Sequence, residues 1–130
     1  CIIGNATKIA GEVVVDDFAI ISAAVLIHQF CHIGSYVMVG GGTRTGQDVP
    51  PYTMAAREPV KYCGLNLVGL RRRGFKPEVI DVLHKTYQLI YQSGKLRADI
   101  IKEIRETMPQ IPEVQYILRF LEESKRGIIS

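Results

Sequence analysis

A period of six residues runs through the first fifty residues of the chain. Cut from residue 3, the sequence reads IGNATK, IAGEVV, VDDFAI, ISAAVL, IHQFCH, IGSYVM, VGGGTR and TGQDVP. Seven of these eight hexads begin with Ile or Val, and the fifth position is always Thr, Val, Ala or Cys. A helix would space its apolar residues by 3.6 and an ordinary strand by two. A strict period of six therefore predicts a solenoid.

Each hexad is expected to supply one short strand and one turn, and three hexads to close a triangular coil of about eighteen residues. The Ile and Val residues would lie inside the coil, so residues 1–52 are predicted to form a parallel β-helix. Small residues recur at the second hexad position, and we interpret its glycines as turn residues where the backbone corners tightly. Pro50 and Pro51 lack the N–H donors of a strand ladder, which predicts that the solenoid ends near Tyr52.

Two local motifs in the solenoid invite different interpretations. The run VGGGTRTG lacks the Lys-Ser/Thr ending of a phosphate loop and leads into two prolines, so a phosphate loop is excluded. His28, Cys31 and His32 present three donors to a metal, but no second ligand pair stands at zinc-site spacing. We therefore predict no metal site here.

The chain changes character after the prolines. Residues 53–75 are rich in turn residues and are predicted to be a connector. Residues 76–92 and 96–108 carry apolar residues at helical spacing, and a third such stripe follows Pro112 and closes near Gly127. Residues 76–130 are therefore predicted to form a helical domain, with the apolar stripes as its core.

Charge excludes several partners. The net charge is only +3, and the basic run Arg71, Arg72 and Arg73 lacks the interleaved aromatic residues of a nucleic-acid site. That run fits either a solvated surface or a fork for a pyrophosphate.

The longest uncharged apolar run, residues 19–27, is too short to span a bilayer, so we expect no stable membrane insertion. Three scattered cysteines favour reduced thiols and a cytosolic setting.

Several segments together resemble a known enzyme family. They are HQFC at residues 28–31, VMVGG at 37–41, QDVPPY at 47–52, GxNxxGLxRRGF at 64–75 and YxLIYxSGK at 87–95. Along its whole length the chain resembles the C-terminal half of UDP-N-acetylglucosamine O-acyltransferases. Hexads alone are shared with many acetyltransferases, whereas the GxNxxGLxRRGF segment and the helical tail are specific to this family.

The resemblance implies a left-handed β-helix in a cytoplasmic homotrimer. It implies an enzyme that moves a 3-hydroxyacyl chain from acyl carrier protein to the 3-hydroxyl of UDP-N-acetylglucosamine, the first step of lipid A biosynthesis, without metal or cofactor. In the family a histidine is the general base, and a backbone N–H stabilises the oxyanion. Gly11 matches the oxyanion donor, and the segment that carries the base is expected upstream of Cys1.

The resemblance also assigns residues to the substrates. His28 and Gln29 match sugar-nucleotide contacts, and Asn66, Arg72 and Arg73 match contacts to the nucleotide and its phosphates. This sequence departs from many members at two positions, because Glu12 stands in place of His and Val68 in place of Glu.

The acyl chain is expected to lie elsewhere on the solenoid. Gly41 matches the position whose side chain limits acyl length, and its missing side chain leaves room for a long chain. Ile20 and Met38 lie eighteen residues apart in a predicted outward column, and Met38 is counted with Gly41 among the acyl-chain residues. A trimer contact or an acyl groove would cover this column.

Some assignments stay open on the sequence alone. His32 and His84 are interpreted as surface residues without function. Because the repeat is already in phase at Ile3, we expect that the chain is truncated at its N-terminus. A Cys1 that carries a lipid is the less favoured explanation of this start. A coenzyme-A-dependent acetyltransferase with the same solenoid and a non-catalytic scaffold remain as rival functions.

Overall fold

The computed structural model describes residues 2–5, 7–57, 60–124 and 127–130, and Cys1 lies outside this part of the chain. Two compact units are present, Cys1–Asn66 with Ser124–Ser130, and Leu67–Glu123. The strands are β1 (Ile2–Ile3), β2 (Lys8–Ile9), β3 (Val14–Val15), β4 (Ile20–Ile21), β5 (Leu26–Ile27), β6 (His32–Ile33), β7 (Met38–Val39), β8 (Arg44–Thr45), β9 (Thr53–Ala56) and β10 (Lys61–Leu65). The helices are α1 (Leu67–Arg72), α2 (Pro77–Gln92), α3 (Arg97–Thr107) and α4 (Pro112–Glu123).

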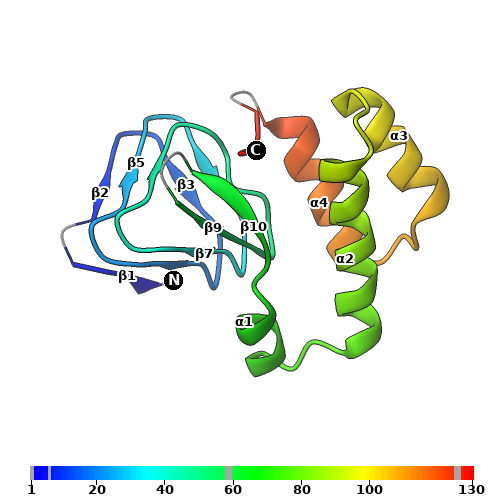
Figure 1. The fold of residues 1–130 in the computed structure, drawn as a ribbon, viewed down its shortest axis with the longest axis horizontal. Helices are drawn as coiled ribbons and strands as arrows, with labels where there is room; N and C mark the ends of the chain where they lie inside the picture. Colours follow the sequence, from blue (N-terminus) through cyan, green and yellow to red (C-terminus); the bar gives the residue numbers. More distant parts are fainter. Residues whose placement is uncertain (1, 6, 58–59, 125–126) are drawn as a thin grey trace. The chain divides into compact units, whose positions relative to one another are not determined.

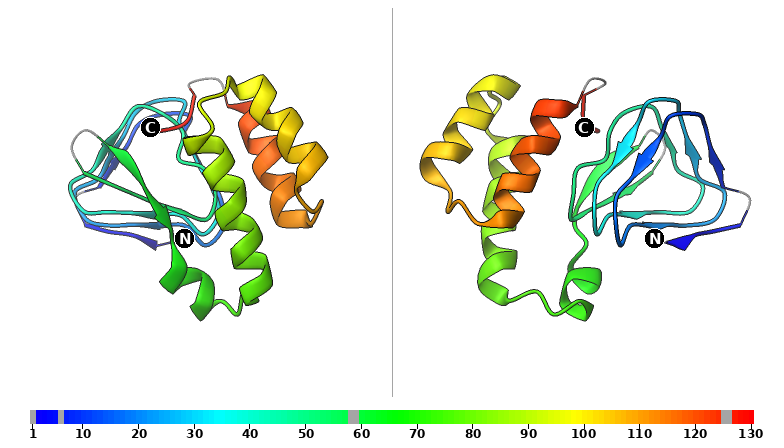
Figure 2. Two further views of the ribbon diagram at one scale, coloured as in Figure 1. Left: turned by 45° about the vertical axis from the view of Figure 1, so that its right-hand side comes forward. Right: turned by 180° about the vertical axis from the view of Figure 1, so that it is seen from behind.

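The strands of the first unit follow one another around stacked coils (Figures 1 and 2). Strands β1, β4, β7 and β9 pair in parallel on one side, β2, β5 and β8 on the second, and β3 and β6 on the third. Ile2 pairs with Ile20 and Ile20 with Met38, a spacing of eighteen residues at each step. The predicted parallel β-helix is confirmed.

The first and fifth hexad positions fill the interior of the coils. Ile21, Ile27, Ile33 and Val39 begin hexads and are fully buried. The fifth position adds smaller side chains, such as Cys31 at 1 % exposure, and both sets belong to one core. Each such side chain leaves water on folding, and a fully buried Ile or Val contributes about 1.5 to 3 kcal/mol.

The corners of the coils repeat a left-handed backbone at the fourth hexad position. Six consecutive hexads have φ between 58° and 74° at this position. The residues are Glu12, Phe18, Ala24, Phe30, Tyr36 and Gly42. Only one of the six is glycine, although this backbone costs non-glycine residues roughly 1 to 2 kcal/mol. Cooperative stacking of the coils therefore imposes the corner geometry on whatever residue stands there.

The sequence suggested that the glycines at the second hexad position are turn residues, but at Gly4 and Gly34 the structure shows a steric reason instead. A Cβ at Gly4 would lie 2.5 Å from the Ala23 nitrogen, and one at Gly34 would lie 2.6 Å from Pro51 Cα. Neither glycine has a positive φ. These positions are small because the next coil passes too close for a side chain, and the tight corner itself does not require them.

Three corners can be defined by their residues. The first corner comprises residues 22–25 and 40–43, the second 10–13, 28–31 and 46–48, and the third 16–19, 34–37 and 50–52. At the third corner the left-handed residues form a stack of rings, with Phe18 and Tyr36 centroids 5.1 Å apart and Tyr36 and Tyr52 centroids 5.8 Å apart.

The solenoid extends beyond the two prolines. Met38 pairs with Met54 and Ile33 with Val49, a spacing of sixteen residues instead of eighteen. The last coil is thus two residues shorter, and it brings Pro50 and Pro51 into the third corner between the ladder donors Val49 and Tyr52. Since no N–H is needed there, the prolines do not interrupt the ladder. The region predicted as a connector instead holds β9, β10, which pairs with it antiparallel, and α1.

The end of the chain returns to the last coil. Ile128 forms a parallel bridge with Asp48, and the Tyr62 N–H donates to the Ser130 carbonyl oxygen. Ile129 is buried in the solenoid core. Ser124 Oγ donates to Asp48 Oδ2 at 2.5 Å, and the His32 N–H donates to Asp48 Oδ1 at 2.7 Å. Asp48 thus joins two coils and the returning tail.

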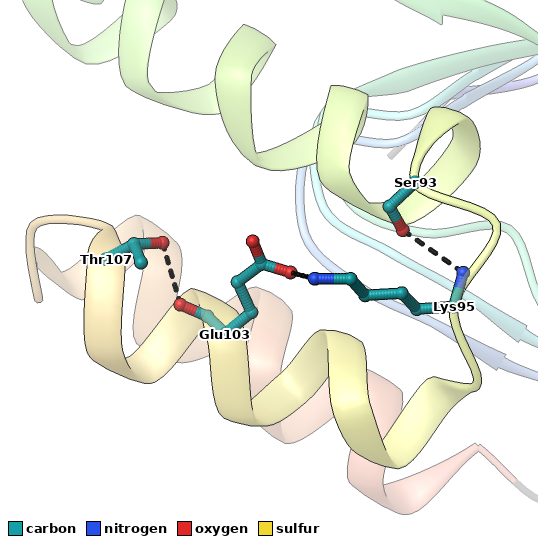
Figure 3. A network of polar contacts seen from close by, with 4 residues as sticks. All are labelled: Ser93, Lys95, Glu103 and Thr107. Atoms are coloured by element: carbon teal, nitrogen blue, oxygen red, sulfur yellow. Dashed lines mark hydrogen bonds and ion pairs between the residues drawn. The ribbon is translucent and has the colours of Figure 1, made fainter.

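The second unit packs α2, α3 and α4 against one another. Its core includes Leu83, Tyr87, Ile104 and Ile117, the apolar stripes expected from helical spacing. Polar contacts secure the turn between α2 and α3 (Figure 3), where Lys95 Nζ lies 2.5 Å from Glu103 Oε2. The helix bounds lie within a few residues of the predicted ones.

Candidate functional site

The second corner brings together the residues expected to bind the sugar nucleotide. Parallel pairing of β2, β5 and β8 places the corner segments one coil apart. Gly11, His28 and Gln29 are exposed there, and so is Gln47 on the following coil. The His28 ring lies over Gly46, whose added Cβ would be 3.6 Å from His28 Cδ2. An imidazole and two amides therefore face solvent along one edge.

Gly11 is a glycine that the fold does not explain. Its φ is not positive, and an added Cβ would have no atom of the described residues within 4 Å. Gly4 and Gly34, by contrast, are crowded by the neighbouring coil. Open space in front of the Gly11 backbone lets a ligand approach the peptide group, as a backbone oxyanion donor requires.

The first corner carries the residues expected to contact the acyl chain. Gly41 is exposed, and an added Cβ would make an ordinary 3.4 Å contact with the Ala23 carbonyl oxygen. Met38 lies three residues earlier and is half-buried in a column with Ile20 and Met54. The outward apolar column therefore exists, and Gly41 follows its middle member, Met38, on the same coil.

Asn66 is held by the third corner. Its side chain is buried at 4 % exposure, and Nδ2 donates to the Tyr36 carbonyl oxygen at 3.0 Å. Its backbone N–H donates to the Tyr52 carbonyl oxygen. Asn66 thus stabilises the corner that carries the stacked rings, a role that the sequence did not suggest.

The arginines belong to the second unit. Arg72 is the last residue of α1 and Arg73 follows it, and both are exposed. Arg71 lines a cavity of about 520 Å³ together with Phe75, Pro77, Ile80, Asp81 and His84. His84, interpreted from sequence as a surface residue, is exposed and borders this cavity.

His32 makes a contact that the sequence did not indicate. Its Nε2 lies 2.8 Å from Asp16 Oδ2 on the preceding coil, and both side chains are mostly buried at 23 % exposure. The two residues stand sixteen apart, two short of a full coil. The signal in the sequence was an acidic residue and a histidine that stand about one coil apart.

Two chemical features are absent from the described part of the chain. No group of three or more His, Cys, Asp or Glu side chains is placed to hold a metal ion among those residues. Within the same residues, no helix has the length and apolar character that a membrane span requires.

Comparison with known proteins matches this architecture to one family. Residues 48–129 match the family model described as UDP-N-acetylglucosamine O-acyltransferase, domain 2. A crystal structure of a UDP-N-acetylglucosamine acyltransferase from Bacteroides fragilis is 52% identical, with a TM-score of 0.98 over 100% of this chain and 51% of that one. The chain belongs to the UDP-N-acetylglucosamine O-acyltransferase family.

Further members of the family agree. A relative from Pseudomonas putida, named acyl-[acyl-carrier-protein]--UDP-N-acetylglucosamine O-acyltransferase, is 42% identical over 98% of this chain. A structure from Acinetobacter baumannii is 38% identical over 97% of this chain, with a TM-score of 0.93. This chain covers 50% of the P. putida relative and thus about half the length of the curated family members that it matches. Like these structures, it is a left-handed parallel β-helix followed by a helical part.

The two departures from the family pattern are both exposed. Glu12 lies at the second corner with a φ of 58°, next to Gly11. Val68 lies in α1 of the second unit and is 62% exposed. A carboxylate at Glu12 puts negative charge at the edge that carries His28 and Gln29.

Proposed function

We propose that this chain supplies part of an enzyme that transfers a 3-hydroxyacyl group from acyl carrier protein to the 3-hydroxyl of UDP-N-acetylglucosamine, the first step of lipid A biosynthesis. The observation that carries the proposal is the match to acyltransferases of this name along 98% of the chain. We further propose a homotrimer in the cytoplasm that uses no cofactor and binds neither nucleic acid nor the membrane interior.

The reaction is an acyl transfer from a thioester to an alcohol. The 3-hydroxyl oxygen attacks the thioester carbonyl carbon while a general base takes its proton. As the carbonyl re-forms, the C–S bond breaks and the carrier sulfur leaves, taking that proton from the base to become the thiol. The Gly11 N–H is the proposed donor to the oxyanion of the tetrahedral intermediate. The open space in front of Gly11 supports this role. The resemblance matches no residue of this chain to the general base.

The remaining residues position the substrates. His28 and Gln29 are proposed to bind the sugar, because both present hydrogen-bonding groups to solvent beside Gly11. Arg72 and Arg73 are proposed to bind phosphate, which a guanidinium can hold bidentately. Asn66 is proposed, from the resemblance, to contact the nucleotide, although it is buried and its Nδ2 donates to the Tyr36 carbonyl oxygen.

Met38 and Gly41 are proposed to contact the acyl chain. Met38 belongs to the half-buried apolar column with Ile20 and Met54, which would carry the methylenes along the outside of the solenoid. Gly41 stands at the corner that follows Met38 on the same coil, so a side chain there would narrow the space beside the column. A second copy of the chain would complete the cover over these residues.

The product of the entire gene should be assayed with two donors, 3-hydroxyacyl-acyl carrier protein and acetyl-coenzyme A, and with UDP-N-acetylglucosamine as acceptor. Mass spectrometry of the acceptor should show a 3-hydroxyacyl ester formed from the carrier protein. Preference for acetyl-coenzyme A would favour the rival acetyltransferase. Failure to bind the acceptor or to react with either donor would favour the scaffold. Light scattering should give three times the mass of one chain.

A further inference from the structure

Phe30 is an exposed aromatic residue at the second corner. It has a left-handed backbone with a φ of 67° and is 54% exposed. The remaining aromatic residues at left-handed solenoid corners, Phe18, Tyr36 and Tyr52, stack on one another at the third corner. Within the described residues, the Phe30 ring has no ring partner. The fold therefore gains little from an aromatic side chain at this position.

The corner geometry does not require an aromatic residue either. The equivalent position is Glu12 one coil earlier and Ala24 at the first corner, with φ of 58° at both. Polar and small side chains thus occupy the same backbone. Neither burial nor φ accounts for Phe30, so its ring is available for contact with a ligand.

The surroundings of Phe30 indicate what that contact is. His28 and Gln29 precede it on the same corner and are exposed, so an imidazole and an amide are presented to solvent at the same corner as the ring. Glycines stand at this edge on the neighbouring coils, Gly11 before it and Gly46 after it. An apolar face with hydrogen-bonding groups beside it is the arrangement that fixes a ligand with one apolar and one polar side.

We propose that Phe30 is a substrate-binding residue whose ring packs against the C–H face of the sugar ring of the nucleotide sugar, while His28 and Gln29 hydrogen-bond the polar groups at the rim of that sugar. This inference rests on the proposed function and adds to it a residue that determines affinity for the acceptor. A pyranose suits the site because its C–H groups project from one face and its hydroxyls from the edge. Phe30 binds and does not take part in proton transfer.

Steady-state kinetics of the entire gene product provide the first test. Phe30→Ala should raise KM for UDP-N-acetylglucosamine by roughly tenfold, the scale of one partly buried aromatic contact, and change kcat by less than about twofold. Phe30→Tyr keeps the ring face and should restore KM. Phe30→Leu keeps apolar bulk without a flat face and should remain impaired. A Leu variant equal to wild type would overturn the ring-stacking geometry.

Phe18→Ala is the matched control. Phe18 has the same hexad position, a φ of 63° and 44% exposure, but it lies at the third corner. Both alanine variants should remain folded, as thermal unfolding will show, and only Phe30→Ala should change KM. An equal rise in KM for both variants would mean that loss of packing alone is responsible, and the proposal would be wrong.

Calorimetry separates the sugar from the nucleotide. Phe30→Ala should weaken binding of UDP-N-acetylglucosamine and leave binding of UDP unchanged, because UDP lacks the sugar. Equal losses for both ligands would assign Phe30 to the nucleotide and overturn the proposal. If the wild-type protein binds neither ligand, the proposed function fails instead. Light scattering of Phe30→Ala should show an unchanged mass, whereas dissociation would place Phe30 in a subunit contact and contradict a role in binding sugar.

Discussion

The second and third corners of the solenoid have the same backbone but use their side chains in opposite ways. At the third corner, Phe18, Tyr36 and Tyr52 stack from coil to coil, and Asn66 donates to two of their carbonyl groups. At the second corner, His28, Gln29 and Phe30 remain exposed. The φ values of Phe18 and Phe30 differ by only a few degrees, 63° against 67°.

This contrast separates what the coil requires from what it leaves free. Six consecutive corners, from Glu12 to Gly42, use a left-handed residue, and the coil needs a small residue wherever the next coil passes close. It does not require a particular side chain at the left-handed position, which Glu12, Ala24 and Phe30 all occupy. One corner can therefore evolve for cohesion and another for binding without any change in the path of the backbone.

The largest expected effect is at the third corner. Tyr52 is 4 % exposed and belongs to the stack of rings, so Tyr52→Ala should lower the free energy of unfolding by about 4 kcal/mol, the range of large-to-alanine changes in cores. Urea denaturation measures this loss. Phe30→Ala is the comparison variant and should lose less than about 1 kcal/mol, because its ring is already in water. Equal losses would remove the distinction between the two corners.

The second effect compares two glycines. A Cβ at Gly34 would lie 2.6 Å from the Pro51 backbone, so Gly34→Ala should cost roughly 3 kcal/mol of unfolding free energy through overpacking. Gly11→Ala meets no described atom and has no positive φ, so it should be neutral or stabilise by about 0.5 kcal/mol. The two substitutions therefore differ in sign.

The same Gly11→Ala variant should nevertheless lower kcat/KM of the entire gene product, because its methyl group fills the space that the substrate needs. Denaturation and kinetics on one preparation test both statements. Full activity in a stable Gly11→Ala protein would withdraw the oxyanion assignment from this backbone position.

The period of six predicted most of the solenoid because each coil repeats the spacing of eighteen. It could not predict the last coil, where the spacing falls to sixteen and Pro50 and Pro51 enter a corner instead of a strand. Amphipathic stripes predicted the three longer helices because burial of one face is a local property of sequence. The cavity beside Arg71 depends on how α1 and the start of α2 come together, and no periodicity reports that.

The candidate site was predictable only in part. Gly11, Gln29 and Gln47 stand eighteen residues apart, a spacing that fits one edge of the solenoid, and the register of the strands before this corner has the same step. The hydrogen bond from Asn66 to Tyr36 was not predictable, because thirty residues and a hairpin separate them. Phe30 was visible inside the HQFC motif, but only the φ values of all the corners show that its aromatic ring is unnecessary for the fold.

The third effect concerns the first corner. Gly41→Met should place a side chain where the distal methylenes of a long acyl chain lie. Each buried methylene contributes about 0.8 kcal/mol, so displacing three or four costs roughly 2.5 to 3 kcal/mol and lowers kcat/KM about a hundredfold for a long donor. A short donor should be spared. The assay compares acyl carrier protein loaded with long and short 3-hydroxyacyl chains.

The control for this variant is stability. The backbone at Gly41 has no positive φ, and an added Cβ makes only ordinary contacts, so Gly41→Met should unfold at nearly the wild-type temperature. If kcat/KM falls equally for the long and the short donor, Gly41 is only a corner residue and does not limit acyl length.

The smallest expected effect concerns the contact between His32 and Asp16, which connects the second and third corners. Asp16 stands at the start of the third corner, and His32 directly follows the second, with His32 Nε2 and Asp16 Oδ2 2.8 Å apart. Asp16→Asn keeps the shape of the side chain and removes its charge. Because both side chains remain 23% exposed to water and salt, the free energy of unfolding should fall by only about 0.5 kcal/mol. At a pH where histidine is protonated, the deficit should shrink as salt is raised from low to high concentration, since screening weakens the wild-type ion pair first. A loss that is several times larger and independent of salt would mean that this contact stabilises the solenoid as the stacked rings do. The second corner would then also have a structural role, and the contrast between the two corners would be wrong.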